Sequence, residues 1–278
     1  MTIDGLKPGL TAHMIVCNEA RWVWFSIMSV IEQVDRMIIY DTGSMDNTVA
    51  IIKSIVDNPR YSEKVIFEEK GTVSSEDFYK LRTEQIERTD TEYFIVVDGD
   101  EIWYEDALLQ VKQTIERKKP ALIAVKFINC AGDMFHYRNY ERETYSIKGI
   151  KGSLTVRVFS MRIPGIHCSG TYGIEGYVTE NELPVQQACD DIVVVDAYYF
   201  HMTYLQRSDF IKGDFAIAYR RKKFKAFWDK RFSSDFNYPE VLYLDFPSIV
   251  KNPWTEKVGV LDYMFCFLRK LIYVLKNR

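Results

Sequence analysis

Apolar runs alternate with amphipathic segments along residues 1–118. The runs are rich in β-branched residues, and the segments between them have the spacing of helices with one apolar face. The predicted strands are Ala12–Cys17, Met37–Tyr40, Val65–Phe67 and Phe94–Val97, and the predicted helices are Trp22–Val34, Thr48–Val56 and Glu76–Arg88. This order predicts βαβ units and a mostly parallel sheet, whose right-handed crossovers bring the strand ends to one edge.

The pattern changes near Lys119. Beyond it, shorter extended segments are separated by loops rich in Gly and Tyr, which predicts antiparallel or mixed strands. These segments are Ala121–Ile128, Ser153–Ser160 and Ile192–Phe200, followed by two predicted helices, the strongly basic Arg207–Lys230 and the terminal Trp254–Lys276. We therefore expect an α/β fold in three parts: residues 1–118, 119–205 and 206–278.

The residues that follow the first four predicted strands are polar and mostly acidic. In open parallel sheets, ligands bind outside the carboxyl ends of the strands. The residues at those ends are Asn18, Glu19, Asp41, Glu68, Glu69, Asp98 and Asp100. Crowded carboxylates at a buried strand end repel one another and lose hydration unless a cation balances them. The segment FIVVDGDEIW, Phe94–Trp103, therefore predicts a divalent cation beside its acids.

Composition excludes several classes of protein. The net charge of -3 argues against a protein built mainly to coat nucleic acid. The five cysteines are scattered without a C-x-x-C pair, so they indicate neither a disulfide framework nor a zinc site and fit a reducing compartment. The N-terminus has no signal-peptide pattern, and no run of about 20 apolar residues occurs. We expect a cytoplasmic protein, with peripheral contact at the inner face of a membrane as an option.

Three motifs in order resemble the family 2 glycosyltransferases. They are HMIVCNEARW, IIYDTGSMDNT and FIVVDGDE, and the similarity extends over residues 11–205. The resemblance implies a GT-A fold with a Rossmann-like, mostly parallel sheet. Residues 1–118 would then form the nucleotide-sugar-binding half, residues 119–205 the acceptor-binding half, and residues 206–278 a C-terminal helical extension.

The resemblance also implies roles for residues of the nucleotide-binding half. Asp41 would bind the base or ribose of a nucleotide-sugar, and Asn18 and Glu19 would line the same pocket. Arg82, in DFYKLRTEQ, matches the arginine of the family's F-x-x-x-R-N pattern and would lie near the nucleotide or its phosphates. The asparagine of that pattern is replaced by Thr83, which puts the contacts of this helix in doubt.

A D-x-D motif implies a metal ion in this family. Asp98 would reach the ribose, or the metal through water, and Asp100 would coordinate Mn²⁺ or Mg²⁺ directly. Both ions favour oxygen ligands, commonly carboxylates together with phosphate oxygens and water. His201 closes an apolar segment, where a lone histidine is usually structural, and the resemblance implies that it completes the metal or diphosphate site. UDP-sugar is the expected donor, and the reaction would be inverting.

An acceptor hydroxyl needs a base to remove its proton. The segment IHCSGTYGIEGYV places Glu175 between glycines in a tyrosine-flanked loop. Related enzymes carry a His-Glu pair in such a segment, and here Ile174 precedes the glutamate. We expect Glu175 to be the base and keep open the alternatives, which are Glu180, Asp190 and Asp191.

Other functions compete with this interpretation. An aspartyl-nucleophile phosphatase also carries D-x-D after a strand, and there Asp98 would attack phosphorus and Asp100 would act as acid and base. The DTGSM segment at Asp41 resembles a metal-dependent adhesion site but lacks its hydroxyls at Gly43 and Met45. A degenerate transferase retained for binding is a further option.

The sequence leaves the acceptor open among a saccharide, a lipid-linked glycan and a protein. The basic segment 218–231 and the apolar stripe of the terminal helix allow peripheral membrane contact or a homodimer. We expect no nucleic-acid partner.

Overall fold

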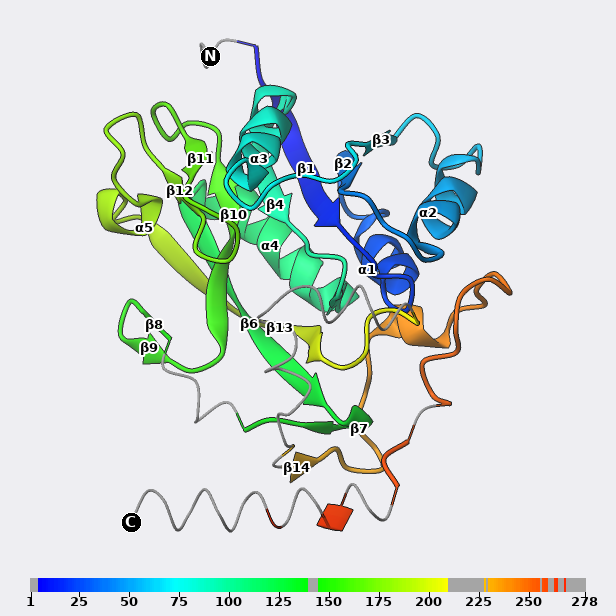
Figure 1. Ribbon diagram of the computed structural model, residues 1–278. Helices are drawn as coiled ribbons and strands as arrows, with labels where there is room; N and C mark the ends of the chain where they lie inside the picture. Colours follow the sequence, from blue (N-terminus) through cyan, green and yellow to red (C-terminus); the bar gives the residue numbers. More distant parts are fainter. Residues whose placement is uncertain are drawn as a thin grey trace.

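The computed structural model describes residues 5–139, 145–209, 228, 230–255, 257–259, 263–264 and 268. Its centre is a mixed, ten-stranded sheet with helices packed against it (Figure 1). In chain order the elements are β1 (Lys7–Val16), α1 (Val23–Val30), β2 (Arg36–Asp41), α2 (Thr48–Val56), β3 (Val65–Glu69), α3 (Phe78–Glu87), β4 (Thr91–Val96), β5 (Glu101–Trp103), α4 (Glu105–Lys118), β6 (Leu122–Ala131), β7 (Asp133–Tyr137), β8 (Ser146–Ile147), β9 (Ile150–Lys151), β10 (Leu154–Ser160), β11 (His167–Ser169), β12 (Gly176–Val178), α5 (Val185–Ala188), β13 (Ile192–Tyr204), β14 (Lys230–Arg231) and the 3-10 helix η2 (Glu240–Tyr243).

The first half of the sheet is parallel, as the alternation of strands and helices predicts. Strand β1 lies between β2 and β4, and β3 extends the sheet beyond β2. Residues from Leu10 to Val16 are buried, as expected for a strand covered on both faces. This arrangement brings the carboxyl ends of β1, β2 and β4 to one edge.

The second half of the sheet is mixed. Strand β10 runs antiparallel to both β4 and β6, and β13 runs parallel to β6. Strand β13 also pairs antiparallel with the short β5, which places His201 opposite Glu101. The prediction of an α/β fold is confirmed, with a sheet that is parallel in its first half and mixed in its second.

The prediction of a helix at Arg207–Lys230 is wrong at both of its described ends. Arg207 lies in irregular structure. Its carbonyl accepts a hydrogen bond at 3.0 Å from the Arg21 amide instead of from a following turn of helix. Lys230 belongs to β14, which pairs with β7. The rest of this predicted helix lies outside the described residues, apart from Trp228.

The predicted terminal helix is described in part only. Trp254 lies in a turn, whereas Tyr263, Met264 and Leu268 are helical, and the other predicted positions from 260 onward lie outside the described residues. Within the described part of the chain, no helix combines the length and the apolar character needed to cross a bilayer.

Strand β4 contributes side chains to the largest core cluster through Tyr93 and Ile95, and to a second cluster through Phe94 and Val96. The Phe94 ring is fully buried and stacks on His13 and Phe159, with ring centroids 4.6 and 5.0 Å apart. Stacked aromatic rings of this size contribute through both buried area and ring contact. The core therefore holds fixed the strand that ends at Asp98.

We predict that Phe94→Ala lowers the free energy of unfolding by about 3–5 kcal/mol, because it leaves a cavity between two aromatic rings. Urea unfolding monitored by circular dichroism measures the change. Met45→Ala is the control, since this side chain is 72% exposed and its loss should cost less than about 0.5 kcal/mol. Equal effects of the two substitutions would contradict the packing of the buried Phe94 ring between His13 and Phe159.

Candidate functional site

The loop after β2 is shaped by side chains from two strand ends. Asn18 follows β1 with a left-handed φ of 55°, a conformation that asparagine tolerates, and its Oδ1 accepts a hydrogen bond from the Met45 amide at 2.7 Å. Asp41 Oδ2 accepts hydrogen bonds from the amides of Gly43 at 2.9 Å and Ser44 at 3.0 Å. The other carboxylate oxygen, Asp41 Oδ1, is buried without a protein partner. It is therefore free to bind a ligand group.

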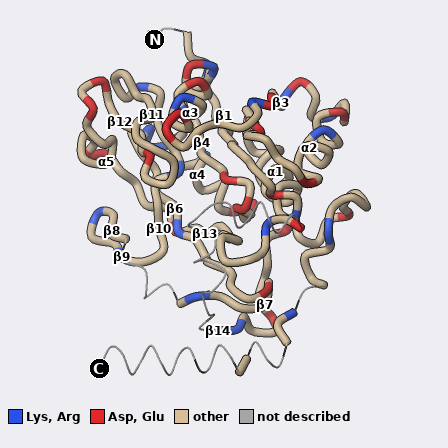
Figure 2. The backbone as a smooth tube through the Cα atoms, in the orientation of Figure 1, with Lys and Arg blue, Asp and Glu red and all other residues tan. Residues whose placement is uncertain are grey.

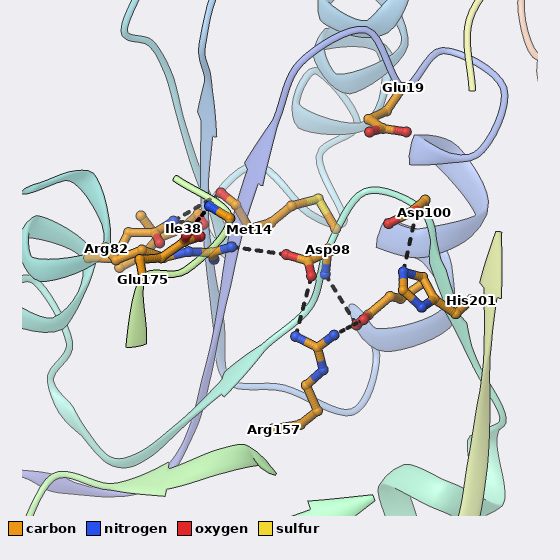
Figure 3. A network of polar contacts seen from close by, with 12 residues as sticks. Met14, Glu19, Ile38, Arg82, Asp98, Asp100, Arg157, Glu175 and His201 are labelled. Atoms are coloured by element: carbon orange, nitrogen blue, oxygen red, sulfur yellow. Dashed lines mark hydrogen bonds and ion pairs between the residues drawn. The ribbon is translucent and has the colours of Figure 1, made fainter. Parts of the chain in front are cut away.

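Asp98, at the end of β4, is held by two arginines. Arg82 Nη2 donates to its Oδ1 at 2.9 Å, and Arg157 Nη1 donates to its Oδ2 at 3.3 Å (Figure 3). Burial alone would raise the pKa of Asp98, but Arg157 and Arg82 outweigh burial and hold that pKa well below its usual range. Asp98 is therefore a carboxylate at any physiological pH.

Arg157 links Asp98 to a second acid. Its guanidinium contacts the fully buried Glu101, and its Nε donates to the Tyr199 hydroxyl at 3.1 Å. Glu101 is the first residue of β5, and its carboxylate accepts from the Asp98 amide at 3.3 Å. A buried charge needs a close opposite charge, so Arg157 fixes the turn that carries the two aspartates.

Asp100 faces another set of partners. It is 2% exposed, its Oδ2 lies 3.5 Å from His201 Nε2, and the same oxygen lies 2.7 Å from Arg207 Nη2. The Asp100 carbonyl accepts a hydrogen bond from the Met202 amide at 2.8 Å. Strand β13 therefore places His201, the residue before Met202, beside Asp100. Arg207 also donates to Glu19 Oε1 at 2.7 Å, which joins the ends of β1, β4 and β13.

The residues around Asp100 suit a cation whose remaining coordination positions are filled by a bound ligand. A carboxylate oxygen and an imidazole nitrogen approach each other there, and no cluster of three or more His, Cys, Asp or Glu side chains suited to a metal occurs among the described residues. Mg²⁺ usually takes one or two carboxylates plus phosphate oxygens and water. Asp100 and His201 therefore fit as the protein's share of a metal site with a bound diphosphate, and not as a closed protein cage.

A cavity of about 560 Å³ opens on the other side of Asp98. Its walls come from α3, β4, β10 and the β11–β12 hairpin, and they include Arg82, Asp98, Arg157, Glu175 and Tyr177. The Tyr177 hydroxyl is buried without a protein partner. The alternatives to Glu175 as base lie elsewhere: Glu180, Asp190 and Asp191 are exposed and do not line this cavity.

The loop that carries Glu175 is braced against helix α3. The Thr83 hydroxyl exchanges hydrogen bonds with the backbone of Cys168, at 3.1 and 3.3 Å, and the Tyr172 ring packs edge-on against Phe78 at 4.7 Å. Thr83, which departs from the family's asparagine, thus attaches α3 to the hairpin. The Glu175 carboxylate accepts from the Gly173 amide, so its position is set within the loop.

A family model described as "Glycosyl transferase family 2" matches residues 11–173 of this sequence. The chain belongs to glycosyl transferase family 2. The matched part includes Asp41, Arg82, Asp98 and Asp100 and ends just before Glu175. The comparison with curated proteins finds no match.

Solved structures of TarS from S. aureus are also similar. Residues 1–349 of TarS match at 14% identity and a TM-score of 0.46, covering 76% of this chain and 64% of that one. The same fragment "in complex with UDP-GlcNAc" matches at 15% identity and a TM-score of 0.48, covering 76% and 66%.

Most of the site residues predicted from the sequence lie at one edge of the sheet. Arg82, Asp98 and Glu175 line the cavity, and Asp100 lies with His201 and Glu19 near Arg207; Asn18 and Asp41 shape the neighbouring loop. Figure 2 shows Lys and Arg interspersed with Asp and Glu along the described chain. At this edge the arginines are partners of the buried acids.

The sequence analysis did not select two arginines of this candidate site, Arg157 and Arg207. Arg157 stands between the buried Val156 and Val158 in β10, and a charge in so apolar a strand was a usable signal. Arg207 gave no such signal, because it meets Asp100 only through the pairing of β5 with β13.

We predict that Arg157→Met lowers the free energy of unfolding by about 3–5 kcal/mol, since it leaves the fully buried Glu101 without its positive partner and leaves Asp98 with Arg82 alone. Arg162→Met is the matched control on the same chain segment: Arg162 pairs with Glu92 at the surface, and its loss should cost less than about 1 kcal/mol. Chemical unfolding of both variants measures the difference. Adding Glu101→Gln to Arg157→Met should restore part of the stability, and a double variant less stable than the single one would contradict the pairing.

Proposed function

We propose that this protein is a metal-dependent, inverting glycosyltransferase that moves a sugar from a nucleotide-sugar, UDP-sugar in the first place, to an acceptor hydroxyl. The observation that carries the proposal is the shared cavity of Asp98 and Glu175. Asp98 belongs to the strand edge where a nucleotide binds in this type of fold, and Glu175 comes from the acceptor half. One space thus contacts both a donor-side carboxylate and a candidate base.

The nucleoside is proposed to bind over the loop shaped by Asn18 and Asp41. Asp41 Oδ1 is buried and has no protein partner, so it can accept a hydrogen bond from the base or the ribose. A buried polar atom without a partner costs free energy that a ligand donor recovers. Arg82 Nη1 is likewise buried without a protein partner, which suits a contact with the phosphates or with the transferred sugar.

Asp100 and His201 are proposed to hold Mn²⁺ or Mg²⁺ together with the diphosphate. Such a cation, when bound, supplies Lewis-acid neutralisation of the charge that develops on the departing nucleoside diphosphate. Asp98 stays ionised between its two arginines and is therefore a fixed acceptor for ribose or sugar hydroxyls. These residues orient the donor with its anomeric carbon toward the cavity.

Glu175 is proposed to remove the acceptor proton. Its carboxylate is only partly buried and is oriented by the Gly173 amide, so an acceptor entering the cavity can reach it. The deprotonated oxygen attacks the anomeric carbon, the bond from that carbon to the diphosphate breaks, and Glu175 keeps the proton. A single displacement of this kind inverts the configuration.

The contacts of Asp98 and Asp41 argue against the two rival functions, a phosphatase and an adhesion site. As a phosphatase nucleophile, Asp98 needs a free carboxylate oxygen, whereas both of its oxygens accept hydrogen bonds from Arg82 and Arg157. In an adhesion site, Asp41 would bind a cation with neighbouring hydroxyls, but its Oδ2 accepts from the amides of Gly43 and Ser44. Both arrangements favour ligand positioning over these chemistries.

We predict that UDP binds more tightly in the presence of Mn²⁺ and that Asp100→Asn removes this gain, with a loss of at least about 10-fold in affinity. Isothermal titration of UDP with and without Mn²⁺ measures it. Asp106→Asn is the control, because this aspartate is exposed on α4 and should bind as the wild type does. If UDP, GDP, CDP and dTDP all fail to bind while an aryl phosphate is hydrolysed, the phosphatase replaces the transferase.

We predict that Glu175→Gln lowers the rate of sugar transfer by about 10²–10⁴-fold, the usual contribution of a general base. UDP affinity should stay within about 2-fold of wild type, since Gln keeps the shape of the side chain and can still accept from the Gly173 amide. The assay is transfer from radiolabelled UDP-sugars to hydroxyl acceptors, with Glu180→Gln as a matched control outside the cavity. Full activity of Glu175→Gln would rule out this glutamate as the base. If the wild type binds UDP but transfers no sugar, the chain is a binding protein.

A further inference from the structure

Arg207 bridges two acids on the donor side of the site. Its Nη1 donates to Glu19 Oε1 and its Nη2 lies against Asp100 Oδ2, both at 2.7 Å. The two residues are almost fully buried, at 3% and 2% exposed, and the Arg207 side chain between them is 11% exposed. Burial alone would lower the pKa of Arg207, but Asp100 and Glu19 raise it above its ordinary value, so the side chain stays charged.

The position of Arg207 is fixed by the chain on both sides of it. The Trp22 indole donates to the Gln206 carbonyl at 2.8 Å, and the Arg21 amide donates to the Arg207 carbonyl at 3.0 Å. The Arg21 guanidinium donates to Asp209 Oδ1 at 2.7 and 3.1 Å. The start of α1 therefore holds residues 206–209, and the Arg207 side chain is directed inward to the strand ends.

This guanidinium occupies the place on Asp100 that a cation needs. A Mg²⁺ ion would bind a carboxylate oxygen at about 2.0–2.1 Å. Arg207 Nη2 is already 2.7 Å from Asp100 Oδ2, the same oxygen that lies 3.5 Å from His201 Nε2. Two positive groups on one oxygen repel each other strongly in a buried site. The ion and the arginine therefore compete for Asp100.

A diphosphate resolves this competition. It brings negative charge to the same strand ends, and a guanidinium matches phosphate oxygens through paired N–H donors. We propose that Arg207 binds the donor's diphosphate, and that Asp100 and Glu19 hold it in its place until the donor arrives. This proposal rests on the proposed function. It adds that cation binding depends on the diphosphate: the cation binds well to Asp100 only together with the diphosphate.

Mn²⁺ alone and UDP are the probes, and the protein is the full chain. For the wild type, we expect Mn²⁺ affinity, measured by electron paramagnetic resonance of the free ion, to rise about 10-fold when UDP is present; linkage requires the same gain for UDP. In Arg207→Met, Mn²⁺ should bind about 10-fold more tightly without UDP. UDP with saturating Mn²⁺ should bind about 10–100-fold more weakly, the range expected for lost charged hydrogen bonds, while uridine affinity stays unchanged.

Two further variants keep the test interpretable. Arg162→Met removes a surface arginine and should match the wild type in every titration. Arg207→Lys retains the positive charge but cannot bridge Glu19 and Asp100 with two N–H groups of one guanidinium. Its Mn²⁺ and UDP affinities should therefore fall between those of the wild type and Arg207→Met. It replaces Arg207→Met if circular dichroism shows that variant to be unfolded.

The outcomes separate this inference from the proposed function. If the wild type binds UDP with Mn²⁺ but the Arg207 variants show unchanged Mn²⁺ affinity, or lose uridine and UDP affinity equally, the inference is wrong and the transferase stands. If no nucleoside diphosphate binds the wild type with Mn²⁺, the proposed function is wrong, and the inference falls with it.

Discussion

Buried acids at the carboxyl edge of the sheet need positive partners, and this requirement shapes the whole site. Water barely reaches the carboxylates of Glu19, Asp100 and Glu101, and that of Asp98 is only 33% exposed, so these acids need positive partners nearby. Three arginines supply the balance: Arg157 for Asp98 and Glu101, Arg82 for Asp98, and Arg207 for Asp100 and Glu19. Four acids thus share three guanidinium groups.

The sheet brings these partners together from distant parts of the chain. The pairing of β10 with β4 places Arg157 beside the strand that ends at Asp98, and the pairing of β13 with β5 places His201 next to Asp100. Arg82 is placed by helix α3, Arg157 by strand β10, and Arg207 by the backbone contacts of residues 206 and 207. A change in the register of β10 or β13 would therefore separate charges as well as core side chains.

The parallel half of the fold could be predicted from the sequence, because its buried strands read as apolar runs that end in polar residues. Asp41, Asp98 and Asp100 were found by that rule alone, and Glu175 needed the family resemblance. Arg207 could not be found, since neither its neighbours in sequence nor its spacing indicates Asp100 as a partner. Its segment was predicted as a strongly basic helix, whereas residues 206–209 are irregular and their backbone is hydrogen-bonded to Arg21 and Trp22, just before α1.

Gly99 separates the tasks of the two aspartates that flank it. A Cβ at this position would lie 2.8 Å from the Val16 side chain and 3.0 Å from that of Glu19, so the turn can pass the end of β1 only as glycine. The Ser26 hydroxyl donates to the Gly99 carbonyl at 2.9 Å and holds the turn against α1. Because the chain turns there, Asp98 faces the cavity with Glu175 while Asp100 faces Glu19. The two aspartates therefore meet different partners on the two sides of a single tight turn: Arg82 and Arg157 at Asp98, and His201 and Arg207 at Asp100.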